Sequence, residues 1–206
     1  MQTSEAVHVI DDDEGVREGL CALLDAKGYL ARPHASCEEF LNRYSADAVL
    51  CIVADLRMPG MGGLDLQAHL LKNSIDLPFI VITGHGDVPS AVRALKSGAA
   101  DFIEKPIDGK LFIAAVERAV VARQAASVAH ERVAALTPRE LDVLCHLVEG
   151  NPNKIIAHQL SISPRTVENH RARLMVKMQA ESVAELVRMA LAAGISAKAD
   201  GQTGGK

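Results

Sequence analysis

The chain has 206 residues, of which 49% are hydrophobic and 23% charged, and its formal net charge is −4 at pH 7. This composition supports packed cores and excludes an intrinsically disordered chain, and no apolar run approaches the roughly 20 residues that cross a bilayer. The four cysteines form no metal-type cluster and the start lacks the features of a signal peptide, so we expect a reduced, cytoplasmic protein.

Charge is distributed unevenly along the chain. Residues 1–135 carry 13 Lys and Arg against 19 Asp and Glu, whereas residues 136–206 carry 9 against 7. An acidic first part and a mildly basic remainder favour two modules that meet different partners.

Short apolar runs alternate with amphipathic segments over roughly the first 120 residues. The runs lie at residues 7–10, 29–32, 48–54, 78–83 and 101–104. The third and fourth are almost continuous in Val, Ile and Leu, which is typical of strands buried on both faces. Between the runs, apolar residues recur at helical spacing, as at Leu20 and Leu24. Five such units predict a doubly wound, flavodoxin-like α/β fold with a five-stranded parallel sheet.

The segment from Asp108 to about Ala135 favours a helix that continues into a solvent-exposed linker, since its stretch AVVARQAASVAHERVAAL contains neither Gly nor Pro. A break follows where Thr137 is expected to cap the next helix and Pro138 to open it. Glu140 stands three residues after Thr137 and completes a capping box. Further helices at about 138–148, 153–160, 164–178 and 182–193 predict an all-α, four-helix domain.

Polar side chains follow the ends of several expected strands. Asp11 and Asp12 end the first, Asp55 the third, Thr83 the fourth and Lys105 the fifth. In an open parallel sheet these carboxyl ends meet at one edge, where ligands bind. Carboxylates brought together repel one another and need a cation, and their oxygens favour Mg²⁺. Because Lys105 and Thr83 supply a positive charge and a hydroxyl to a phosphoryl group on Asp55, the pattern predicts a phosphoryl-transfer site.

The segments VIDDDE, VADLRMPGMGG, IVITGHGD and DFIEKP resemble the signature segments of response-regulator receiver domains, and together they cover residues 1 to about 122. The resemblance implies that a sensor histidine kinase phosphorylates Asp55 and that the domain slowly removes the phosphate by itself. It also implies that Asp12, Asp55 and the Arg57 carbonyl bind Mg²⁺, with Asp11 acting through water.

The same resemblance implies how the site signals. Thr83 and Phe102 would form the switch pair, and Lys105 would contact the phosphoryl oxygen and precede a cis peptide bond to the next proline. The phosphorylated domain is expected to dimerise through a face that includes Val92 and Lys96.

A basic helix is expected after a turn in the second part of the chain. Ser163 would cap this helix and Pro164 would open it. Val167, Leu174 and Met178 lie on one face, toward a core, while the other face is rich in Lys and Arg. Such a helix fits the major groove of DNA, although on composition alone a solvated surface is an equally good interpretation.

The segments LTPRE, NPNKIIA and ISPRTVENHRARLMVKM resemble the LuxR/NarL-type helix-turn-helix over about 136–193, and within that family the nitrogen-fixation regulators. Asn169 departs from that subgroup, in which a Val is typical at this position. Transferred to matching positions, the residues that face bases are Glu168, Asn169 and Ala172, and those that face the DNA backbone are Lys154, Arg165, Thr166, His170, Arg171 and Lys177.

These resemblances imply a transcription activator rather than an enzyme. Its expected partners are a sensor histidine kinase, promoter DNA, RNA polymerase and, on phosphorylation, a second copy of the chain, with no membrane contact. The nitrogen-fixation likeness implies oxygen-responsive control and a haem oxygen sensor as the kinase. The expected segments are a receiver at 1–122, a helical linker at 123–135, a DNA-binding domain at 136–195 and a disordered tail at 196–206.

Three alternatives stay open at this point. A receiver protein of the same fold could control a different regulon or answer a different stimulus. A stand-alone enzyme of the flavodoxin-like or haloacid-phosphatase kind could use Asp55 as a nucleophile, and Arg57 argues against the phosphatase because it stands where a second catalytic Asp is expected. A receiver could also carry an output domain that binds protein, and salt-dependent DNA binding separates that case from the first interpretation.

Overall fold

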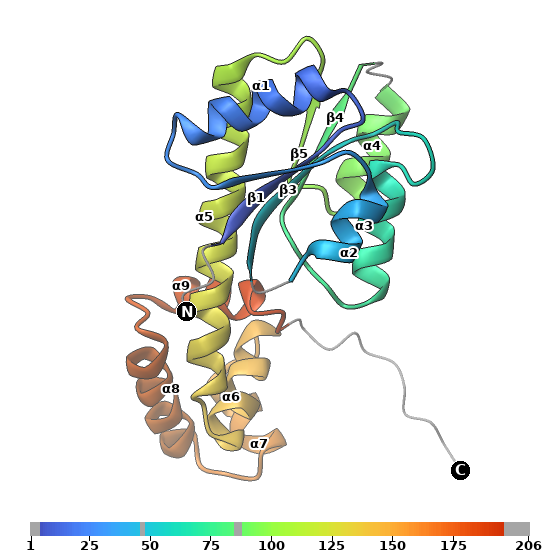
Figure 1. Cartoon of the computed structure of the whole chain (residues 1–206). Helices are drawn as coiled ribbons and strands as arrows, with labels where there is room; N and C mark the ends of the chain where they lie inside the picture. Colours follow the sequence, from blue (N-terminus) through green and yellow to red (C-terminus); the bar gives the residue numbers. More distant parts are fainter. Residues whose placement is uncertain (1–4, 46–47, 85–87, 196–206) are drawn as a thin grey trace, which may run out of the picture. The chain divides into compact units, whose positions relative to one another are not determined.

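The computed structural model describes residues 5–45, 48–84 and 88–195, and the chain divides into two compact units, Met1–Arg123 and Gln124–Lys206 (Figure 1). The expected disordered tail at 196–206 lies outside the described residues. Among the helices that are described, none combines the length and the apolar character needed to cross a membrane.

The first unit contains a five-stranded parallel sheet, as predicted. Its strands are β1 (Ala6–Ile10), β2 (Ala31–His34), β3 (Val49–Asp55), β4 (Phe79–Thr83) and β5 (Asp101–Glu104). They lie in the order β2-β1-β3-β4-β5, and each pairs in parallel with its neighbour. Strands β1 and β4 are buried along their whole length, because helices cover both faces of the sheet. The strand order reverses between β1 and β3, and that reversal places a ligand site at their carboxyl ends.

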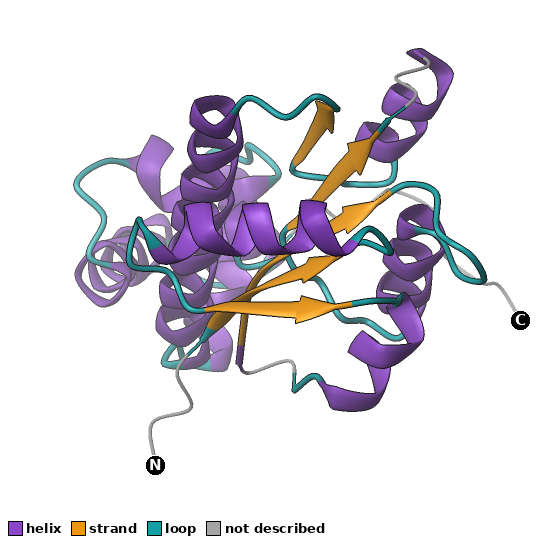
Figure 2. Ribbon diagram, turned by 45° about the horizontal axis from the view of Figure 1, so that its top comes forward, coloured by secondary structure: helices purple, strands orange, loops and turns teal. Residues whose placement is uncertain are grey.

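Helices pack on both faces of the sheet (Figures 1 and 2). On one face, α1 (Glu14–Asp25) and the first part of α5 (Gly109–Ala134) bury Leu24 and Phe112 against the strands. On the other face, α2 (Cys37–Arg43), α3 (Gly63–Lys72) and α4 (Val88–Lys96) bury Phe40, Leu66 and Ala94. The helical spacing of Leu20 and Leu24 is thus explained by burial of both residues in the first of these cores.

The predicted position of the second strand was wrong by two residues. It begins at Ala31 and ends at His34, whereas the sequence pattern favoured residues 29–32. Leu30 is 42% exposed and precedes the strand, although its carbonyl accepts a hydrogen bond from the Val7 N–H at 2.8 Å. The strand also contains Pro33, which the pattern disfavours. Proline is tolerated there because β2 is an edge strand that pairs only with β1.

The second unit is helical. After the last part of α5, its helices are α6 (Pro138–Val148), α7 (Asn153–Gln159), α8 (Pro164–Met178) and α9 (Val183–Ala192), and these four each lie within one residue of the prediction. The capping box is confirmed, because Thr137 N–H donates to the Glu140 carboxylate at 2.9 Å while Thr137 Oγ1 accepts from the Glu140 N–H. Ser163 caps α8 by accepting a hydrogen bond from the Thr166 N–H.

Candidate functional site

Three carboxylates meet at the switch point of the sheet. Asp11 directly follows β1 and Asp55 ends β3, so the pairing of these strands brings the two residues together. Asp11 and Asp55 are buried, at 1% and 7% exposure, while Asp12 faces solvent. One carboxylate oxygen from each of the three lies within 4.8 Å of the others. This all-oxygen cluster, open on one side, has the donor chemistry of a site for a hard divalent cation.

Lys105 neutralises part of this charge. Its Nζ donates to Asp11 Oδ2 at 2.8 Å and to Asp55 Oδ2 at 2.6 Å, and its side chain is only 22% exposed. Burial opposes the charge on Lys105, but its hydrogen bonds to both carboxylates outweigh that effect and raise its pKa. Burial also raises the pKa of Asp11, against the opposing influence of the Lys105 hydrogen bond. The site therefore holds a fixed cation beside the expected phosphoryl acceptor.

Backbone contacts hold the carboxylates in place. Asp11 Oδ1 accepts a hydrogen bond from the Asp13 N–H at 2.9 Å, and Asp55 Oδ1 accepts one from the Arg57 N–H at 3.1 Å. Arg17 Nη1 donates to the carbonyls of Asp11 and Asp12, at 2.7 and 3.1 Å. Sequence reasoning missed Arg17, because its position on α1 belongs to no spacing pattern that would indicate a contact with the preceding loop.

Two glycines let the loop after β3 return across Asp55. A Cβ atom at Gly63 would lie 2.6 Å from the Asp55 carbonyl oxygen, and one at Gly62 would lie 2.7 Å from the Leu56 carbonyl oxygen. Such distances are shorter than van der Waals contact, so larger residues at either position would push the loop off the strand end. The MPGMGG stretch thus shapes the backbone around the acidic cluster.

The remaining receiver residues are spread over the neighbouring strands and α4. Thr83 ends β4 and is 1% exposed, and Phe102 lies on β5 beside Val81, half-buried against the core under α3 and α4. Val92 and Lys96 are both exposed, one turn apart on α4. The Lys105–Pro106 peptide is cis, as the resemblance implied.

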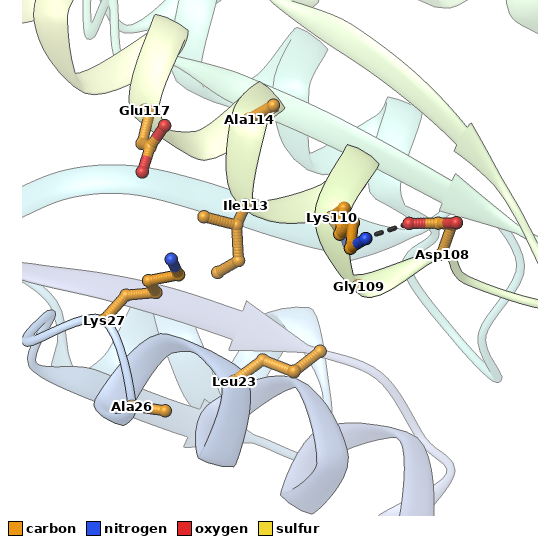
Figure 3. Close-up of a pocket in the computed structure, with 9 residues that line it drawn as sticks. All are labelled: Leu23, Ala26, Lys27, Asp108, Gly109, Lys110, Ile113, Ala114 and Glu117. Atoms are coloured by element: carbon orange, nitrogen blue, oxygen red, sulfur yellow. Dashed lines mark hydrogen bonds between the residues drawn. The ribbon is translucent and has the colours of Figure 1, made fainter.

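A surface hollow of about 590 Å³ lies between α1 and α5 in the first unit, and no member of the acidic cluster lines it (Figure 3). Leu23 and Ile113 line it with apolar side chains, and Lys27 and Glu117 line it with charged ones. This hollow is therefore separate from the acidic cluster.

In the second unit, α7 and α8 form a helix-turn-helix. Ser161 in the turn has a φ of 54°, and the Ile162 N–H donates to the Ala157 carbonyl at 3.0 Å. Val167, Leu174 and Met178 are fully buried, as their spacing predicted. The residues left exposed along α8 are Pro164, Arg165, Glu168, Asn169, Ala172, Arg173, Val176 and Lys177, while Thr166, His170, Arg171 and Met175 are half-buried.

Two of the basic residues in α8 have partners inside the unit. Arg171 Nη1 donates to Asn153 Oδ1, at the start of α7. Lys177 Nζ donates to Glu140 Oε2 at 2.7 Å and to the Ala135 carbonyl at 3.2 Å. The hydrogen bond from Lys177 and those from Thr137 lower the pKa of Glu140 to about 2. Arg165 is exposed on α8 and Lys154 on α7, and neither has a partner among the contacts of the described residues.

Comparison with known families accounts for both units. The response regulator receiver domain family matches residues 7–117, and the bacterial regulatory proteins of the luxR family match residues 134–190. The FixJ transcriptional regulatory protein of Azorhizobium caulinodans is 50% identical over 204 residues, which cover 95% of this chain and 96% of that protein. FixJ of Rhizobium meliloti is 48% identical over 199 residues, which cover 93% and 98%.

Solved structures agree with this assignment. The response regulator StyR is 36% identical with a TM-score of 0.54, and the alignment covers 91% of this chain and 98% of that one. The crystal structure of FIXJ-N is 47% identical with a TM-score of 0.52, and the alignment covers 58% of this chain and 95% of that one. The sheet described above therefore has the fold of solved receiver domains.

Proposed function

The chain belongs to the two-component response regulators, with a receiver domain followed by a luxR-family DNA-binding domain, and we propose that phosphorylation of Asp55 controls its binding to promoter DNA. The observation that carries this proposal is the position of Lys105, whose ammonium group contacts Asp55 and Asp11 beside the carboxylate of Asp12. Such a set of groups supports phosphoryl transfer by positioning and charge neutralisation.

The residues present fit Mg²⁺, since three carboxylates offer oxygen ligands within one ion's reach. When bound, Mg²⁺ neutralises the charge that develops on the transferring phosphoryl group. Asp12 and Asp55 would hold it with the Arg57 carbonyl, while Asp11 would hold one of its waters. An Asp55 oxygen attacks the phosphorus of the kinase phosphohistidine, and the phosphorus–nitrogen bond breaks toward the imidazole. Lys105 pairs with the new phosphoryl oxygens. Water later attacks the phosphorus, which breaks its bond to the Asp55 oxygen, releases inorganic phosphate and restores the carboxylate.

The proposed switch runs from Thr83 to the surface of α4. Movement of the buried Thr83 hydroxyl toward the phosphoryl group leaves space that the half-buried Phe102 ring enters. This change favours dimerisation through a face that includes the exposed Val92 and Lys96. Sedimentation of the chain with Asp55 phosphorylated tests it: a dimer that Val92→Glu abolishes is expected, and a persistent monomer at high concentration overturns this step.

In the proposed complex, α8 enters the major groove of promoter DNA. Asn169, with Glu168 and Ala172, faces base edges, because an amide both donates and accepts and so pairs bidentately with adenine. The exposed Arg165 and Lys154 contact the DNA backbone, and Thr166, His170 and Arg171 add further contacts to it. The ammonium of Lys177 is directed to Glu140, so its phosphate contact requires that ion pair to open.

In this proposal the protein is a transcription activator of the cytoplasm, and RNA polymerase is a further partner. The relatives named FixJ favour nitrogen-fixation control, and with it a haem oxygen sensor as the kinase. Genome-wide DNA occupancy with and without oxygen tests this setting. Occupancy that follows Asp55 phosphorylation but not oxygen would assign another stimulus to the same switch.

The central proposal is tested by labelling the full chain with radioactive acetyl phosphate. Label that depends on Mg²⁺ is expected on the wild-type chain and on Asp76→Asn, a matched change at an exposed carboxylate. Asp55→Asn keeps the side-chain shape but loses the nucleophilic oxygen, so its label should vanish. Equal labelling of Asp55→Asn, or labelling that survives removal of Mg²⁺, overturns the proposal.

A further inference from the structure

The carboxyl end of α8 is held by side chains from outside the helix-turn-helix. Arg132, in the last turn of α5, donates from Nη1 to the Met178 carbonyl at 2.8 Å and from Nη2 to Gln179 Oε1 at 2.6 Å. From α8 itself, Lys177 donates to the Ala135 carbonyl and to the Glu140 carboxylate. All these residues belong to the second unit.

The conformation in which α8 ends explains why Arg132 contacts it. Gln179 takes the left-handed conformation, with a φ of 51°, where glycine is the usual residue. The N–H groups of Gln179 and Ala180 satisfy the carbonyls of Val176 and Met175. The Met178 carbonyl is bonded by Arg132, whose positive charge also suits the negative end of the helix dipole. The guanidinium thus binds the last helical carbonyl and the side chain of the strained cap together.

We propose that Arg132 is a positioning residue for sequence reading: by anchoring the carboxyl end of α8 to the last turn of α5, it sets the angle at which α8 presents Asn169 to the bases. This inference rests on the proposed DNA-binding function. Asn169 lies nine residues before Met178, or about 13 Å along the helix axis. A tilt of about 10° at the anchored end therefore moves Asn169 by about 2 Å, enough to lose a bidentate hydrogen bond to a base.

Arg132 acts through α8 rather than on DNA itself. Two of its guanidinium nitrogens are already bonded to the protein, at the end of α8 remote from the base-facing residues. Phosphate contacts tolerate small tilts, because Coulomb attraction has no strict direction, whereas base contacts do not. Loss of the anchor should therefore reduce binding to a specific site far more than binding to arbitrary DNA.

The experiment uses the full chain, phosphorylated with acetyl phosphate, and two duplexes. One is enriched by the wild-type chain from a random library, and the other is a scrambled duplex of the same composition. Arg132→Ala should bind the enriched duplex about tenfold more weakly and the scrambled one within about twofold of wild type, with an unchanged salt slope. The amides of Gln179 and Ala180 should exchange faster with solvent. Arg139→Ala, an equal loss of charge at an exposed residue of α6, should change neither affinity.

Arg132→Lys keeps the charge and one donor direction, so its affinity for the enriched duplex should fall between those of wild type and Arg132→Ala. If the alanine variant does not fold, the lysine variant provides the same test. Equal losses on both duplexes by Arg132→Lys or Arg132→Ala would overturn the inference. So would a salt slope on the scrambled duplex that falls by about one unit, since Arg132 would then contact phosphate directly. If the wild-type chain enriches no duplex, the proposed function itself fails, and the inference with it.

Discussion

The Nζ atom of Lys105 lies 2.6 Å from Asp55 Oδ2, although 50 residues separate them along the chain. The contact exists because β3 and β5 end at the same edge of the sheet. It places the cation of the site against the residue that we propose as phosphoryl acceptor. Because the Lys105 ammonium group contacts both buried carboxylates, it competes with a metal ion for their oxygens.

Lys105→Met should therefore tighten divalent binding while it slows phosphorylation. Removing the ammonium removes its repulsion of a nearby divalent ion, and we expect affinity for Mn²⁺ or Mg²⁺ to rise by about tenfold. The same change removes the charge that pairs with the phosphoryl oxygens, so labelling by acetyl phosphate slows. Electron paramagnetic resonance of Mn²⁺ measures the first effect. Weaker Mn²⁺ binding by Lys105→Met than by wild type would contradict it.

The buried carboxylate of Glu140 has Lys177 as its positively charged hydrogen-bond partner. Lys177→Met should lower the free energy of unfolding of the second unit by about 1–3 kcal/mol, since it removes a hydrogen bond between charged groups. The lowered pKa of Glu140 stabilises the fold above pH 4.5, and that contribution is lost as the pH falls toward about 2. Urea unfolding across this range should show a flatter pH dependence for Lys177→Met. Lys154→Met, at an exposed lysine of α7, serves as the control.

Buried histidines should make the first unit sensitive to acid. His8 is 3% exposed, and its Nδ1 lies 2.8 Å from His34 Nε2 on the neighbouring strand. Burial, with the nearby His34 and Arg32, lowers the pKa of His8 from 6.5 to about 4. The unfolded chain therefore takes up the proton first, and stability falls as the pH drops from 6.5 toward 4, by on the order of 3 kcal/mol. Nuclear magnetic resonance titration checks this: a midpoint for His8 near 6.5 would refute it.

The exposed residues of α8 should divide into two functional classes. Arg165→Ala should weaken binding to specific and random duplexes alike and reduce the salt slope by about one unit, as expected for a phosphate contact. Asn169→Ala should cost about 1–3 kcal/mol on the specific duplex and little on random DNA. Binding isotherms over a range of salt concentrations separate the two outcomes. Equal loss by Asn169→Ala on both duplexes would show that Asn169 does not read bases.

Helix boundaries in the second unit were predictable because local chemistry specifies them. Thr137 with Glu140 and Ser163 with Pro164 supply caps whose partners lie within four residues, so the sequence pattern contains all the information required. The edge strand β2 was placed wrongly for the opposite reason. Its exposed Arg32 and Pro33 give no apolar signal, and only the pairing with β1 sets its register.

The sequence by itself determined the parallel sheet, the helix-turn-helix and the residue types at the strand ends. These follow from periodicity and capping, which act over a few residues, and from the rule that parallel strands end at a common edge. Only the tertiary structure decided which long side chains pair with which partners. Arg17 with the Asp11 carbonyl, Arg132 with the Met178 carbonyl and Lys177 with Glu140 are examples. A flexible cationic side chain reaches many acceptors, so packing, rather than spacing along the chain, selects the one that it binds.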